Sequence, residues 1–344
     1  MKALRYWGLF AFGGGCLALG SLSCGAAPSP PNYQVTKSVA LGAPDRWDYV
    51  VFDPPSHRVY VAHGDRVTVV DGVDGSIIGQ VEGYAGGTHG IAIVGALGKG
   101  FTDDGRAGEA GAFDLKTLKT IGRIKTAEDA DAIVFDPASG HVFVINGDSG
   151  TITAIDPKQD SAVSNVKAGG KLEAAVAGGD GKLYVNGAEK SEIIRLDTKS
   201  DRIDARWSIP NCKSPHGIAI DPLAHRLFSS CVNNVLVVVN LDSGATVATL
   251  PIGSGTDAAA FDSVRKLIFS SNGHDGTLSV IREKSPDSFE TVGTVKTAVS
   301  ARTMDVDPVS GRIYLAAADH DKSTVAGKSI VPGSLKLLFL DPSP

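Results

Sequence analysis

The feature that most constrains this chain is a short phrase that returns about every 42 residues. It reads FDPPSHRVYV at 52–61, FDPASGHVFV at 135–144, IDPLAHRLFS at 220–229 and VDPVSGRIYL at 306–315. Fainter copies lie at 177–186 and 261–270. Short apolar strands and tight turns that repeat at a fixed spacing of this length are typical of a β-propeller.

The number of repeats follows from the residue that opens the inner strand of each one. This residue recurs seven times, as Asp48, His89, Asp131, Glu173, His216, Asp257 and Arg302. The last repeat stops at 334–344, after its third strand, and a strand pattern at 33–42 can supply the missing fourth. We therefore predict an all-β, seven-bladed β-propeller over 33–344, whose amino-terminal strand closes the last blade and removes the open sheet edge.

The residues of the repeats also resemble those of a known protein family. The Asp-Pro turns, the strands built around one aromatic residue and the third strands ending in VVD resemble the YVTN-repeat (YncE-like) family of exported bacterial β-propellers. The segments 212–231, 270–281 and 301–308 resemble one periplasmic branch of that family. The resemblance covers 33–344 and implies the fold and export, but the family has no single agreed activity to carry over.

The first residues predict export. Lys2 and Arg5 precede an apolar run at 6–22 that is too short for a membrane span, so 1–24 reads as a signal peptide. The residues before Cys24 resemble a lipobox, which would make Cys24 a lipidation site and 25–32 a flexible linker. Ordinary cleavage near Ala26 is the alternative, and both predict a periplasmic or cell-envelope protein.

Cysteine usage and charge narrow the function classes. Only Cys212 and Cys231 lie in the folded part, and in an exported protein this pair predicts one disulfide. The net charge of -5, without a basic cluster, argues against a nucleic-acid partner. No haem-attachment or nucleotide-binding motif occurs, and we expect a monomer.

The seven residues that open the inner strands predict the site. Alternate strands of a propeller run in opposite directions, so these residues should share one face and ring the mouth of the central channel. The turns after the second strands add His63, His274 and His320 farther out on that face. The long segment 322–333 lies there too, as a binding loop or an ordinary insertion.

Three interpretations of this ring remain open. Metal ligands would be His89, Asp131, Glu173 and His216, whose chemistry suits Zn²⁺, Mn²⁺ or Fe²⁺. Without a metal, the ring is a funnel for a polar ligand, or a hydrated collar in which Arg302 neutralises Asp48 and Asp257.

The sequence thus favours an exported β-propeller that binds a small polar ligand or a divalent metal at the channel mouth. The alternatives are a metal-dependent lyase or hydrolase that uses the same ring, with no catalytic residue identifiable, and a platform that binds periplasmic proteins.

Overall fold

The structure is a computed structural model that describes residues 32–321 and 329–343. Contacts divide the chain into residues 1–30 and 31–344, and every described residue belongs to the second unit. The predicted signal peptide, Cys24 and most of the linker therefore lie outside the described residues, as does 322–328 of the long insertion. Within the described ranges, no helix is long and apolar enough to cross a membrane.

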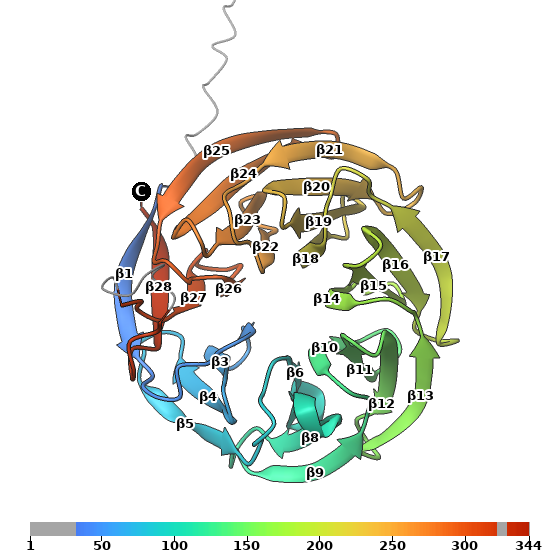
Figure 1. Cartoon of the computed structure of the whole chain (residues 1–344), viewed down its shortest axis with the longest axis vertical. Helices are drawn as coiled ribbons and strands as arrows, with labels where there is room; N and C mark the ends of the chain where they lie inside the picture. Colours follow the sequence, from blue (N-terminus) through green and yellow to red (C-terminus); the bar gives the residue numbers. More distant parts are fainter. Residues whose placement is uncertain (1–31, 322–328, 344) are drawn as a thin grey trace, which may run out of the picture. The chain divides into compact units, whose positions relative to one another are not determined.

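Seven four-stranded antiparallel sheets surround a central axis, which confirms the predicted seven-bladed β-propeller (Figure 1). From the inner strand outward, blade 1 contains β2 (Val50–Asp53), β3 (Arg58–His63), β4 (Arg66–Asp71) and β5 (Ile77–Glu82), and blade 2 contains β6 (Ile91–Val94), β7 (Lys99–Asp104), β8 (Glu109–Asp114) and β9 (Thr120–Lys125). Blade 3 contains β10 (Ala130–Asp136), β11 (His141–Asn146), β12 (Thr151–Asp156) and β13 (Ser161–Lys167), and blade 4 contains β14 (Leu172–Ala177), β15 (Lys182–Gly187), β16 (Glu192–Asp197) and β17 (Arg202–Ser208).

Blades 5 to 7 follow the same plan, with the chain's first strand as the outermost strand of blade 7. Blade 5 contains β18 (Pro215–Asp221), β19 (Arg226–Cys231), β20 (Val235–Asn240) and β21 (Thr246–Pro251). Blade 6 contains β22 (Ala259–Asp262), β23 (Leu267–Asn272), β24 (Thr277–Ser285) and β25 (Ser288–Lys296). Blade 7 contains β26 (Thr303–Val306), β27 (Ile313–Ala317), β28 (Lys336–Ser343) and β1 (Asn32–Ala40). Two short 3-10 turns, η1 (Gly95–Leu97) and η2 (Gly105–Ala107), interrupt the less regular second repeat.

Burial along the strands explains why the repeat phrase is so apolar. The second strand of each blade is covered on both faces by the neighbouring blades, so β19 and β23 are buried at every residue. Outer strands such as β17 alternate between exposed and partly buried residues, because only one face meets protein. The aromatic residue at the centre of each second strand is almost fully buried, and these are Tyr60, Phe101, Phe143, Tyr184, Phe228, Phe269 and Tyr314.

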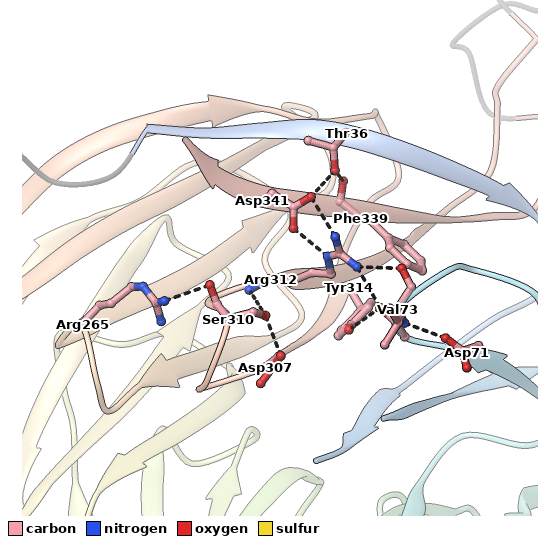
Figure 2. A network of polar contacts seen from close by, with 11 residues as sticks. Thr36, Asp71, Val73, Arg265, Asp307, Ser310, Arg312, Tyr314, Phe339 and Asp341 are labelled. Carbon is pink, nitrogen blue, oxygen red and sulfur yellow. Dashed lines mark hydrogen bonds and ion pairs between the residues drawn. The ribbon is translucent and has the colours of Figure 1, made fainter. Parts of the chain in front are cut away.

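Ring closure joins the two ends of the described chain. β1 pairs with β28 in antiparallel register, from Asn32 opposite Ser343 to Ala40 opposite Lys336, which confirms the predicted closing strand. Figure 2 shows the side chain that ties this sheet to blade 1. The Arg312 guanidinium contacts Asp341 of β28 at 2.6 Å and donates to the carbonyl oxygen of Gly72 in blade 1 at 2.9 Å.

The position that Arg312 holds is used in the same way in other blades. Arg58 and Lys99 also lie at the start of a second strand. Arg58 donates to the carbonyl oxygen of Leu115 in blade 2 at 2.7 Å, and Lys99 to that of Pro157 in blade 3 at 3.0 Å. Basic side chains of the repeat therefore link consecutive blades.

The predicted disulfide is confirmed. Cys212 and Cys231 are bonded, their Cα atoms are 5.4 Å apart, and both side chains are fully buried. The bond joins the loop that enters β18 to the end of β19, and so fixes the loop just before His216, which lies at the start of β18.

Tyr33 offers a test of the closing strand. Its ring is buried against Phe269 of blade 6, with the centroids 5.2 Å apart and the planes nearly perpendicular. We expect Tyr33→Ala to lower the free energy of unfolding by about 3 kcal/mol in chemical denaturation, because a buried aromatic side chain leaves a cavity. Tyr33→Phe is the matched control and should be as stable or more stable, since the Tyr33 hydroxyl is buried without a hydrogen-bond partner in the described part of the chain. Equal stability of the Ala variant would contradict this role for the strand.

The disulfide gives a second test. Replacing both Cys212 and Cys231 by Ala opens a loop with a sequence separation of 19. The chain-entropy model then predicts a loss of about 3 kcal/mol in unfolding free energy. Reduced wild-type protein should lose a similar amount. Mass spectrometry that finds two free thiols in protein from an oxidising compartment would refute the bond.

Candidate functional site

The seven predicted ring residues occupy equivalent places in the structure. All seven are partly buried, and in six repeats both sequence neighbours are buried, so the polar side chain is the accessible one. In blades 3, 4 and 5, the ladder between the first and second strands has a β-bulge beside the ring residue. A bulge changes the direction of a side chain without ending the sheet.

Backbone conformation also positions the ring residue. In five repeats the residue two places before it has a positive φ, as at Asp129, Ser214 and Ser300, where φ is 59°, 46° and 81°. Gly87 and Gly255 occupy the same position with φ of 110° and 78°. Left-handed backbone is rare outside glycine, so its recurrence here indicates a turn geometry that the repeat retains.

The charges of the ring interact across the axis. Burial, together with the charge of Asp257, raises the pKa of Asp48 to about 7, against the opposing effect of Arg302. Burial and the charge of Asp48 raise the pKa of Asp131 well above its ordinary value. These residues come from blades 1, 3, 6 and 7, so the structure brings charges from separate blades within range of one another.

Two pairs of ring residues from adjacent blades are in direct contact. Arg302 Nε lies 3.0 Å from Asp257 Oδ2, and His216 Nε2 lies 3.8 Å from Glu173 Oε1. Burial raises the pKa of Glu173, although the charges of His216 and Lys171 act in the opposite direction. The sequence paired Arg302 with both Asp48 and Asp257. In the structure, Arg302 forms an ion pair with Asp257 and acts on Asp48 through its charge.

His89 is held by a buried carboxylate that the ring prediction did not include. Its Nδ1 lies 2.7 Å from Oδ2 of Asp103, which is fully buried and also accepts from the backbone N–H groups of His89 and Gly90. Burial would lower the pKa of His89, but the bond to Asp103 and its charge outweigh burial and raise the pKa to about 9. Replacing His89 by Ala would leave Asp103 buried with one partner fewer, so this substitution should disturb the loop as well as the ring.

Tyr49 forms the floor beneath the ring. It follows Asp48 in blade 1, yet its side chain packs against the apolar clusters between blades 3 and 4 and between blades 4 and 5, on the opposite side of the axis. Burial, followed by the charges of Asp131 and Asp48, raises the pKa of its hydroxyl well above the ordinary value. The Tyr49 side chain therefore reaches across the axis beneath the ring, and we call the ring together with Tyr49 the cup.

The sequence contains a signal for this floor that the repeat analysis did not use. The residue after the ring position is small in the other repeats, as Gly90, Ala132, Ala174, Gly217, Ala258 or Thr303. Tyr49 is the one large side chain at this position. A narrow axis has room for one such group, so a single aromatic residue among small ones points to a plug.

The three predicted outer residues have different fates. His63 is fully buried; its Nδ1 contacts Thr68 at 2.8 Å and its Nε2 contacts the carbonyl oxygen of Pro44 at 2.7 Å. Burial lowers its pKa, so His63 anchors the loop before blade 1 and does not face a ligand. The reason is its place as the last residue of β3, where the side chain turns into the sheet. His274 and His320 instead line a pocket beside the cup.

This pocket has a volume of about 700 Å³ and lies where blades 6, 7 and 1 meet. Besides the two histidines, its walls include Arg46, Trp47 and Arg302. Arg302 lies over the Trp47 ring, 5.2 Å from its centroid, and donates to the Trp47 carbonyl oxygen at 3.0 Å. Arg302 thus belongs both to the ring and to the pocket.

Metal binding stays a prediction. Across the described residues, no group of three or more His, Cys, Asp or Glu side chains is arranged to hold a metal ion. His89 and His216 are instead engaged with Asp103 and with the carbonyl oxygen of Ser214.

Comparisons with known proteins support the fold. No protein-family model and no curated protein matches the chain. Among solved structures, the chain is similar to U3-55K (TM-score 0.76, 9% identity, 92% of this chain and 100% of that chain) and to the RRP9 WD40 repeats (TM-score 0.76, 9% identity, 91% and 99%). It is also similar to hydrazine synthase from Kuenenia stuttgartiensis (TM-score 0.68, 12% identity, 79% and 92%). Identities this low show a shared β-propeller architecture, and the YVTN-repeat family remains a resemblance.

The raised pKa of Asp48 predicts how stability depends on pH. An acid whose pKa is higher in the folded protein, here about 7 against 3.8, stabilises the fold when protonated. This contribution is complete below about pH 4 and is lost as the pH rises through about 7. We expect the melting temperature of Asp48→Asn to fall less between pH 4 and pH 8 than that of the wild type. The exposed Glu128→Gln variant is the control, and identical slopes for Asp48→Asn and wild type would contradict the assignment.

Proposed function

We propose that this protein binds a small polar ligand in the cup formed by the seven ring residues above Tyr49. The observation that carries the proposal is the convergence of polar side chains from separate blades above the Tyr49 side chain. Burying several carboxylates together is costly unless they are protonated or paired. Groups with strongly shifted pKa values in a concave site are typical of binding and catalytic sites.

The chemistry of the cup favours a ligand with several hydroxyl or amine groups. A carboxyl group whose pKa is raised toward neutrality keeps a proton part of the time, so it can donate or accept a hydrogen bond. Asp48, with a pKa raised to about 7, has this character, and the pKa of Asp131 is shifted in the same direction. Arg302 adds guanidinium donors to the ring. A ligand with both donors and acceptors therefore matches the ring better than a purely apolar one.

The scaffold supports binding without a large ordering cost. The bulges and left-handed residues hold the ring side chains in place before any ligand arrives. Preorganisation of this kind increases affinity, because little conformational freedom is lost on binding.

We also propose that the protein works outside the cytoplasm, in the periplasm or the cell envelope. The disulfide between Cys212 and Cys231 supports this location, because structural disulfides persist in oxidising compartments. The signal-like segment 1–24 supports it independently, with Cys24 as a lipid anchor or with cleavage near Ala26.

The test is a thermal-shift screen of small polar compounds, followed by calorimetry of each hit. We expect a hit to raise the melting temperature of the full chain. Its affinity should fall at least about tenfold in Asp131→Asn and in Glu173→Gln, since each loses a charged hydrogen-bond partner. Both substitutions keep the side-chain volume and leave the His89–Asp103 contact in place.

The exposed Glu128→Gln variant serves as the matched control and should bind like the wild type. Hits whose affinities are the same in both ring variants and in the control would refute binding in the cup.

A further inference from the structure

The pocket beside the cup is built from hydrogen-bond donors. From this we infer that it binds the oxyanion group, carboxylate or phosphate, of an organic ligand. This inference goes beyond the proposed function, because the pocket has its own walls and shares only Arg302 with the ring.

Trp47 provides the first argument. Its side chain lines the pocket and is only 5% exposed, yet its indole N–H has no hydrogen-bond partner among the described residues. Buried donors are almost always paired in folded proteins, since an unpaired one costs free energy. Because the indole can donate but not accept, the missing partner must be an acceptor.

Arg46 provides the second argument. Its guanidinium has no ion pair with a carboxylate among the described residues, and its one polar contact is to His89 Nε2 at 3.0 Å. That nitrogen can accept from Arg46 only while the imidazole is neutral. Asp103 raises the pKa of His89 to about 9 in spite of burial, so the charged imidazole is favoured at neutral pH and cannot serve as the acceptor. Arg46 is therefore available to an external anion.

The acceptors in the pocket wall are already used within the protein. Asp45 accepts from the backbone N–H groups of Gly333 and Leu335, at 2.6 Å and 2.9 Å. The hydroxyl of Ser300 donates to the carbonyl oxygen of Ala318 and accepts from its N–H. An incoming cation or neutral donor would find these groups occupied.

Repulsion from the ring carboxylates is the main argument against an anion here. Asp257 is paired with Arg302 at 3.0 Å, and Asp48, Asp131 and Glu173 do not line the pocket. Arg302 thus separates the acidic ring from the pocket and keeps part of its guanidinium exposed, with 42% of its side chain accessible.

The remaining walls indicate that the anion is part of a larger organic molecule. Val299 and Ile330 add apolar surface. The imidazoles of His274 and His320 add ring nitrogens to the wall, and Nδ1 of His320 is buried without a partner among the described residues. A volume of about 700 Å³ exceeds what an inorganic ion needs.

The experiment titrates the full chain with inorganic phosphate and, separately, with citrate, by calorimetry and by tryptophan fluorescence. Glycerol and choline are the neutral and cationic comparison probes. We expect at least one of the two anions to bind. Comparing their affinities shows whether the pocket prefers a phosphate or a carboxylate group. Trp47→Phe should lower the affinity for that anion about tenfold, because the substitution deletes one N–H donor to a charged group and keeps an aromatic ring. Arg46→Gln should have an effect of similar size.

Two matched controls separate the pocket from general effects of charge and fluorescence. Arg202→Gln removes one positive charge from the exposed outer strand of blade 4 and should leave the affinity unchanged. Trp207→Phe removes the tryptophan that stacks on Tyr184 in blade 4. The fluorescence of this variant, which retains Trp47, should still respond to the anion. The unliganded Trp47→Phe protein should melt no earlier than the wild type, because the deleted N–H has no partner to lose within residues 32–321 and 329–343.

Three results would overturn the inference. The first is that neither anion binds at millimolar concentration. The second is that affinity is equal in the wild type, Trp47→Phe and Arg46→Gln, which would mean an adventitious ion only. The third is that glycerol or choline binds with the same dependence on Trp47 and Arg46. The proposed function is judged separately, by the Asp131 and Glu173 variants and the ligands of the cup.

Discussion

Closure of the ring by the first strand is the constraint on which the rest of this structure depends. β1 covers the free edge of β28, and the Arg312 guanidinium fastens the closed sheet to blade 1. Closure also brings blades 7 and 1 together at the axis, where Arg302 donates to the Trp47 carbonyl and Thr303 donates to that of Asp48 at 2.7 Å. The candidate site therefore depends on an interaction between residues more than 250 positions apart in the sequence.

The closed scaffold allows an arrangement that an isolated sheet would not tolerate. Asp48 and Asp131 are held close to one another although burial and mutual repulsion disfavour their charged forms. Seven blades packed through almost fully buried second strands supply the stability that offsets this cost. Ionisable side chains that are buried close together, where water does not stabilise their charges, tend to mark functional positions. This tendency is the physical basis for assigning function to the cup.

The cup and the neighbouring pocket are complementary in charge. The cup is rich in carboxyl groups, whereas the pocket presents guanidinium and indole donors, and Arg302 lies between them with its Nε on Asp257. A ligand with an amine or hydroxyl end and an anionic end would fit both parts. This arrangement links the two proposals without making either depend on the other.

The sequence by itself determined the fold, the number of blades, the closing strand, the disulfide and the seven ring positions, because each is written into a repeat or a cysteine pair. Those signals are local or periodic, so they can be recognised in the sequence without the three-dimensional structure. Only the tertiary structure decided which polar residues face the site. His63 turns into the sheet, Asp103 is buried under His89, and Tyr49 crosses the axis to blades on the far side. The pocket of Trp47 and Arg46 exists only where the first and last blades meet, and contacts between distant segments leave no periodic trace in the sequence.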